Sequence, residues 1–182
     1  AVTGNAVLNG AATGLSTLSV SGTTALNGVT VTSSGTQTYT GAVTLGSNAE
    51  LTGSTVSFGN TVAGGSKSLA VTGNAAFNGA VSGLSTLGVT GTTLLNTDEV
   101  TTSGAQTYGD AVTLGASTTL SGTTVTTQGT VAGNTNALAI AGNAVLGNSV
   151  EDAVTGLSTL SVSASSTINT DTVSTTGAQT YT

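Results

Sequence analysis

Apolar and polar residues alternate along this chain in short stretches such as Leu18-Ser19-Val20 and Thr55-Val56-Ser57-Phe58. Gly, Asn and Ser separate these stretches, while Val and Thr within them favour the pleated surface of a strand. No window of about 11 residues holds an uninterrupted helical stripe of apolar positions. The pattern therefore predicts an all-β protein built from many short strands.

The chain repeats itself, because segments of its first third return later in the same order. The segment Val2–Ala6 returns as Val71–Ala75, and Gln37-Thr38-Tyr39 returns as Gln106-Thr107-Tyr108. A third copy gains a four-residue insertion around Glu151 and Asp152. The predicted organisation is one continuous array: unit 1 over 1–69, unit 2 over 70–138, and a partial unit 3 over 139–182 that carries the insertion.

Each unit divides again, because an apolar residue followed by a small polar or turn residue recurs at one short spacing and two longer ones. Stacking one strand-rich coil on the next buries the core of such a repeat. We therefore expect a parallel β-solenoid, a β-helix, of about eight rungs averaging about 23 residues, with three rungs per 69-residue repeat. The longer spacings are interpreted as longer loops, and the insertion is placed at a turn. The eight markers are Leu8-Asn9, Leu26-Asn27, Leu51-Thr52, Phe77-Asn78, Leu95-Asn96, Leu120-Ser121, Leu146-Gly147 and Ile168-Asn169.

A string of β-sandwich domains, one per unit, is the alternative fold. It accounts for the long period but not for the markers inside each unit. A sandwich also needs bulky core residues to fill its interior, and the chain has only three Tyr and two Phe. A narrow tube lined by Val, Leu and Ala needs no such bulky residues.

Composition argues against disorder and against binding of nucleic acid. Hydrophobic residues make up 37% of the chain, too many for a typical disordered segment. Charged residues make up 4%, the net charge is −6, and Lys67 is the only basic side chain. Nucleic acids are held through Lys and Arg, so no nucleic-acid partner is expected. No apolar run approaches the ~20 residues of a membrane-spanning helix, so none is predicted.

The chain has little material for catalysis, because it lacks His and Cys and its few acids are scattered. We expect no enzyme activity, no catalytic residues and no cofactor. Asp98 and Glu99 are adjacent at a predicted turn and form a weak candidate for a Ca²⁺ site. Solvated turn carboxylates are the simpler interpretation, and a metal site is not otherwise expected.

Asn residues follow several of the apolar markers, which allows two interpretations. Side-chain amides stacked once per rung would form a polar ladder, or each Asn would simply satisfy an unusual turn conformation. The Tyr residues of the three units either cover the thin core or line one face as ligand contacts. The ladder candidates are Asn9, Asn27, Asn78, Asn96 and Asn169.

Three segments, Gly104–Tyr108, Asp110–Gly115 and Thr119–Val125, resemble the repeats of filamentous-haemagglutinin-like adhesins, bacterial exoproteins of the two-partner-secretion type. The resemblance covers the whole chain and rests on low-complexity patterning. It implies a right-handed parallel β-helix, export to the bacterial cell surface or the extracellular space, and a role in adhesion or biofilm.

The expected function is that of a structural shaft or matrix fibre, with copies of the chain as partners through end-to-end or lateral packing. A surface- or glycan-binding adhesin module is the alternative, with host or matrix glycans as partners and the loop at Glu151 and Asp152 as its candidate contact. An ice-binding solenoid is a remote alternative suggested by Thr36–Thr40. Against it, such an array should recur on every rung, whereas this segment occurs once per unit.

Overall fold

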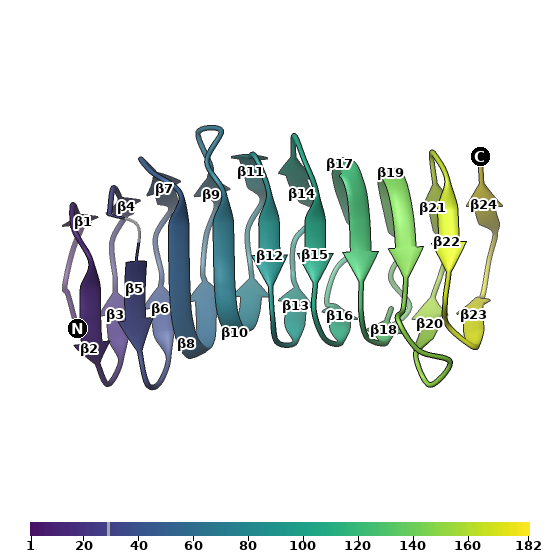
Figure 1. Ribbon diagram of the computed structural model, residues 1–182, viewed down its shortest axis with the longest axis horizontal. Helices are drawn as coiled ribbons and strands as arrows, with labels where there is room; N and C mark the ends of the chain where they lie inside the picture. Colours follow the sequence, from purple (N-terminus) through teal and green to yellow (C-terminus); the bar gives the residue numbers. More distant parts are fainter. Residues whose placement is uncertain (29) are drawn as a thin grey trace.

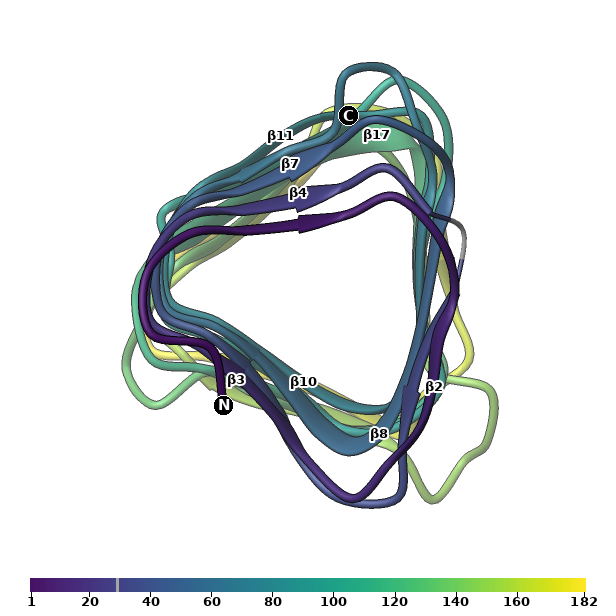
Figure 2. The ribbon, with the colours of Figure 1, turned by 90° about the vertical axis from the view of Figure 1, so that its left-hand side faces the viewer.

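A computed structural model describes residues 1–28 and 30–182. The chain winds into a three-sided rod, and the described residues form 24 strands that run parallel from turn to turn within one sheet (Figures 1 and 2). Seen from the N-terminal end, the chain turns clockwise as it recedes, so the solenoid is right-handed (Figure 2). The predicted all-β parallel β-solenoid is confirmed. The described residues contain no helix long and apolar enough to cross a bilayer.

The strands stack into three flat faces, and four long strands bend around a corner to serve two faces each. Face 1 contains β1(Ala6–Leu8), β4(Thr24–Leu26), β7(Val43–Leu45), β9(Val62–Ala63), β11(Val81–Leu84), β14(Glu99–Thr102), the first halves of β17(Thr118–Thr127) and β19(Leu138–Leu146), β21(Leu160–Val162) and β24(Gln179–Tyr181).

Face 2 contains β2(Ala12–Leu15), β5(Thr30–Ser33), the first halves of β8(Ala49–Phe58) and β10(Leu69–Phe77), β12(Leu87–Val89), β15(Gln106–Tyr108), the second halves of β17 and β19, and β22(Ser166–Ile168). Face 3 contains β3(Leu18–Val20), β6(Gln37–Tyr39), the second halves of β8 and β10, β13(Thr93–Leu95), β16(Val112–Leu114), β18(Val131–Ala132), β20(Ala153–Leu157) and β23(Thr172–Thr175).

The turn is shorter than the marker spacing suggested, and the expected eight longer rungs are wrong. Thr24 pairs with Val43, and this spacing of about 19 residues gives about nine turns. In the described part of the chain only the insertion lengthens a turn markedly, where Val131 pairs with Val154. Each of the two longer marker spacings therefore spans four sides of the triangle, one more than a full turn, rather than one turn with a longer loop.

The long repeat is out of phase with the turn. The strand β3 lies on face 3, whereas its copy in unit 2, β12, lies on face 2, because eleven sides of the triangle separate them. The copy of β12 in unit 3 is β21, on face 1. Three rungs per repeat is thus also wrong: one repeat spans three turns and two further sides, and each unit is rotated by one face relative to the last.

The core is a narrow column of inward side chains that alternate with outward ones along each strand. Tyr39, Phe58 and Phe77 stack on successive turns of face 3, with ring centroids 5.7 and 5.1 Å apart. The same column continues with Leu95 and Leu114, both fully buried. Burying each such side chain contributes about 1.5–3 kcal/mol, so stability is distributed along the whole rod.

Candidate functional site

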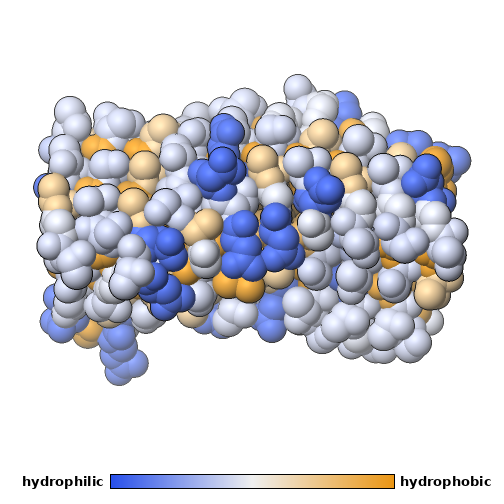
Figure 3. Space-filling view, turned by 180° about the vertical axis from the view of Figure 1, so that it is seen from behind, coloured by the Kyte–Doolittle hydropathy of each residue, from blue (hydrophilic) through white to orange (hydrophobic). Residues whose placement is uncertain are grey.

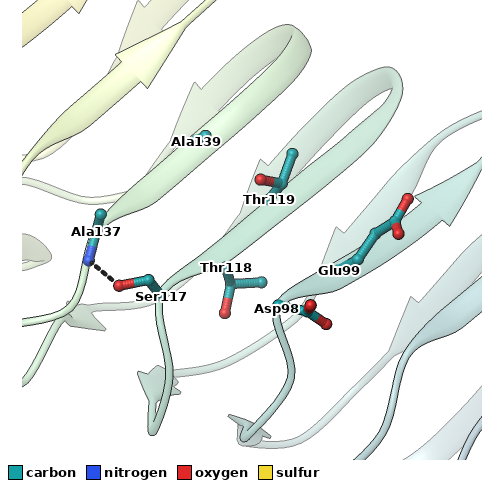
Figure 4. Close-up of a pocket in the computed structure, with 7 residues that line it drawn as sticks. All are labelled: Asp98, Glu99, Ser117, Thr118, Thr119, Ala137 and Ala139. Carbon is teal, nitrogen blue, oxygen red and sulfur yellow. Dashed lines mark hydrogen bonds between the residues drawn. The ribbon is translucent and has the colours of Figure 1, made fainter.

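The two candidate Ca²⁺ ligands lie beside a shallow groove of about 470 Å³ at the corner between faces 3 and 1 (Figure 4). Asp98 is exposed at the corner and Glu99 is exposed on face 1, and their carboxylates point in different directions (Figure 4). The Thr101 hydroxyl donates to the Glu99 carboxylate over 2.6 Å. Beyond the two acids, the groove is lined by Ser117, Thr118, Thr119, Ala137 and Ala139.

This groove offers few ligands for a hard cation. Ca²⁺ takes about six to eight oxygen ligands, usually with several carboxylates converging on one point. The described residues contain no group of three or more His, Cys, Asp or Glu side chains that could hold a metal ion. With two diverging carboxylates, the Ca²⁺ site at Asp98 and Glu99 stays a prediction.

The five Asn ladder candidates are exposed and fall at three different corners because of the phase of the repeat. Asn27 donates its amide to Asn9 over 2.9 Å, and Asn96 donates to Asn78 over 2.8 Å. Asn169 instead donates to the Gly147 carbonyl over 3.2 Å. The structure therefore brings the candidates together as two pairs on adjacent turns and leaves Asn169 apart from both.

Glycine ends each of these pairs. Gly46 and Gly115 occupy the corresponding corner of the next turn, and a Cβ at either position would collide with the side-chain oxygen of Asn27 or Asn96. The amide row cannot extend to a third turn, because the Asn side chain fills the space that a side chain there would need.

Three further Asn residues, whose role the sequence analysis missed, each join two successive turns, and each lies at a different corner of the rod. Asn5 and Asn74 each accept a hydrogen bond from the backbone N–H of the next turn, at Thr23 and Thr92, over 2.9 and 3.0 Å. Asn143 accepts from the Ser165 hydroxyl over 2.7 Å. The recurrence of the Gly-Asn-Ala motif once in each unit was the available signal.

The Gln-Thr-Tyr segments form buried locks rather than ligand contacts. Gln106 donates its amide to the carbonyls of Val100 and Ser121 over 3.0 and 2.9 Å, which ties its own turn to the next. The Tyr108 hydroxyl donates to the Gln106 side-chain oxygen over 2.9 Å. Gln37 and Tyr39 form the same contacts one unit earlier.

The Tyr residues of the three units do not line one face, so that interpretation is wrong. Tyr39 and Tyr108 are fully buried, on faces 3 and 2. Tyr181, on face 1 of the last turn described, is 39% exposed. Burial raises the pKa of both Tyr39 and Tyr108 above the usual value for tyrosine. Because these phenols lie inside the core, they stay protonated and act as structural donors.

The four-residue insertion lies at a corner, as predicted, between β19 on face 2 and β20 on face 3. Asp152 accepts hydrogen bonds from the backbone N–H groups of Asn148 and Ser149, over 2.9 and 3.1 Å. Val150, at the tip, is 76% exposed, and Glu151 beside it is exposed. This loop projects from the rod and leaves the strand register on either side intact.

The hydroxyl row behind the ice-binding hypothesis is longer than one segment. Ser19, Thr38 and Ser57 stand in register on successive turns of face 3 with their side chains outward. Ala76 and Leu94 follow in the same column and interrupt the row. The row of hydroxyl groups therefore spans three turns. The sequence analysis did not find it, because it assumed a rung longer than the actual turn.

Comparison of the chain with protein-family models, with curated proteins and with solved structures finds no match. The resemblance to filamentous-haemagglutinin-like adhesins accordingly stays a prediction from the sequence.

Proposed function

We propose that this chain is a segment of the structural shaft, or matrix fibre, of a large secreted bacterial surface protein. The observation that carries the proposal is the continuous parallel ladder, in which every turn bonds to the turns directly before and after it. Such an architecture is quasi-one-dimensional, so its length and stability grow with the number of turns. A rod of this kind holds a partner-binding domain away from a cell surface or builds a matrix around it, on the outside of the bacterium.

The surface chemistry agrees with a passive shaft. Seen from behind, the rod is covered mainly by residues of intermediate hydropathy with few strongly hydrophilic ones (Figure 3). Outward Ser and Thr side chains are hydrated, and the corner contacts of Asn5, Asn74 and the Gln-Thr-Tyr locks all serve to join turns. Each of these Asn and Gln groups has a structural partner within the rod.

A surface- or glycan-binding module is the second candidate, and the corner loop at 148–152 favours it. Loops carried on a rigid scaffold are common places for recognition. Glu151 and the exposed Val150 would offer one acidic and one apolar contact to a host or matrix glycan. This candidate predicts binding that is lost when the loop is shortened.

The shaft proposal is tested by lengthening the rod in phase. Thr182 stands where Thr40 stands in unit 1, so residues 41–182 appended after Thr182 continue the repeat. The product should be one longer rod, extended by about seven turns of ~19 residues, or roughly 35 Å at the ~4.8 Å spacing of stacked strands.

Small-angle X-ray scattering measures both the maximum dimension and the cross-section. The shaft proposal expects the first to grow by that increment while the second stays constant. A tandem joined by a flexible Gly/Ser linker supplies the reference for two independent bodies. If the in-phase tandem scatters like the linked reference, the two copies are independent bodies, and the shaft proposal is wrong.

A further inference from the structure

Three of the apolar markers are followed by glycine, which creates pairs of residues that can react with each other. The pairs are Asn9-Gly10, Asn27-Gly28 and Asn78-Gly79. The backbone nitrogen of the residue after an Asn can attack the Asn side-chain amide, and glycine obstructs this approach least because it has no Cβ. At the markers of Asn96 and Asn169 the next residue is threonine, whose branched side chain hinders the same attack.

Packing between turns requires a glycine after Asn at these corners. A Cβ at Gly28 would collide with the carbonyl group of Gly10 on the preceding turn. A Cβ at Gly79 would lie 2.6 Å from the carbonyl carbon of Asn60, which is also too close. The stacking of turns therefore accounts for the presence of the reactive pair.

Asn27-Gly28 and Asn78-Gly79 each lie between two described turns, but they bond differently to the preceding turn. In unit 1, the backbone N–H groups of Asn27 and Gly28 both donate to the Leu8 carbonyl, over 2.9 and 2.7 Å. The nitrogen that would attack the Asn27 side chain is thus held in a hydrogen bond to the preceding turn.

In unit 2 the side chain of Asn78 takes the place of the glycine N–H. The backbone N–H and the side-chain amide of Asn78 both donate to the Phe58 carbonyl, over 2.9 and 3.0 Å. Among the residues that the structure describes, no acceptor receives the Gly79 N–H. Asn78 is exposed at the corner between faces 3 and 1, so water reaches the pair.

Asn78 also accepts a hydrogen bond on the atom that gains charge when its amide is attacked. Asn96 donates its side-chain amide to the Asn78 side-chain oxygen over 2.8 Å. A donor at this position stabilises the negative charge that develops on a carbonyl oxygen as a nucleophile adds. The side chain of Asn27 instead acts as the donor in its own pair with Asn9.

We propose that Asn78 is a site of spontaneous deamidation, at which it cyclises with Gly79 and becomes aspartate or isoaspartate. The Gly79 nitrogen bonds to Cγ of Asn78, the bond from Cγ to the side-chain nitrogen breaks, and ammonia leaves with the proton that the Gly79 nitrogen gives up. The cyclic imide then takes up one water and opens at either of its two carbonyl carbons. Water is the only co-reactant, and the proposal does not depend on the shaft function.

Either product weakens this corner. Aspartate lacks the amide N–H that bonds to the Phe58 carbonyl, and it adds a negative charge. Isoaspartate also adds one methylene group to the main chain between β10 and β11, just before Val81 pairs with Val62 and Val100 on the neighbouring turns. Deamidation should therefore loosen the contact between these turns.

The test is peptide mass spectrometry of the purified whole chain after incubation in mildly alkaline buffer, with Asn27-Gly28 as the matched internal control. In the folded chain we expect Asn78 to deamidate at least about fivefold faster than Asn27, the factor that corresponds to about 1 kcal/mol for the hydrogen bond that holds Gly28. In urea the two sites should react at similar rates, because the hydrogen bonds that distinguish them are lost.

Equal rates at the two sites of the folded chain, a faster reaction at Asn27, or an Asn78 that does not react overturns the proposal. If Asn78 reacts faster by the same factor in urea, the local sequence and not the fold sets the rate, and the structural argument fails. N78Q, at an exposed position, should keep the circular dichroism spectrum and abolish the mass change in its peptide; a mass change that persists there belongs to another residue and refutes the assignment. None of these results alters the length of the tandem rod, so the shaft proposal is tested separately.

Discussion

A buried hydroxyl group without a partner recurs once in each unit and gives a sharp test of the structure. The side-chain oxygens of Thr24, Thr93 and Ser166 are buried and make no hydrogen bond within the described part of the chain. Thr93 lies between Ala75 on the preceding turn and Val112 on the next, in one inward column. Since valine already fills the next place in that column, the site accepts its shape.

Replacing Thr93 by valine should therefore stabilise the protein. An unsatisfied buried polar group costs about 1–3 kcal/mol, and valine removes the hydroxyl while keeping the volume. We expect T93V to raise the free energy of unfolding by about 1 kcal/mol. T24V should do the same, and since the two residues lie on different turns without contact, their effects should add.

The matched control is Thr118, which is equally buried but paired. Its hydroxyl donates to the carbonyls of Thr97 and Ala116 over 2.7 and 3.0 Å, and the residue is 3% exposed against 2% for Thr93. T118V should lower the free energy of unfolding by about 1–2 kcal/mol, because it removes a hydrogen bond and leaves a buried acceptor without its donor.

Urea unfolding followed by far-UV circular dichroism measures these differences, provided that the dependence on urea is unchanged between variants. Opposite signs for T93V and T118V are the expected result. If T93V destabilises the protein as much as T118V does, the Thr93 hydroxyl has a partner, such as a buried water, and the reasoning fails.

Two further predictions concern the buried phenols and the corner loop. Because burial raises the pKa of Tyr39 and Tyr108, the folded state keeps protons that the unfolded state loses above about pH 10. The contribution of these two phenols to stability should thus be constant below that pH and fall by about 1.4 kcal/mol per pH unit for each phenol above it. The urea midpoint should fall with rising pH above this point in the wild type, and roughly half as steeply in Y108F, which keeps only one fully buried phenol. Equal slopes in the two proteins would contradict the argument. Deleting residues 148–151 should leave the circular dichroism spectrum unchanged. It should change the free energy of unfolding by less than about 1 kcal/mol, because shortening a surface loop has a small entropic effect. Loss of β structure would show instead that the loop supports the strand register.

The sequence predicted the candidate sites unevenly. Asn9 and Asn27 were expected to be neighbours and are hydrogen-bonded, whereas Asn169 is equivalent to Asn27 in sequence and lies at a different corner. The corner itself does not decide the pairing, because Asn96 lies at a third corner and still bonds to Asn78. Asn169 has no Asn to pair with because Gly147 stands where Asn9 and Asn78 stand in the other units, a difference that the sequence already contained. The interior position of Tyr108 was open from the sequence, since a Tyr flanked by Thr fits a strand in either orientation.

The sequence by itself determined that this chain forms many short β-strands in a stacked array with a thin aliphatic core. That information is local, since Val and Thr alternate with small residues and Gly or Asn marks many of the corners. The length of a turn and the orientation of each repeat were decided only by the tertiary structure. All three faces accept the same inward Val, Leu and Ala side chains, so the sequence encodes one side of the triangle at a time. Closing three sides and pairing Thr24 with Val43 fixes the turn and sets the long repeat one face out of phase.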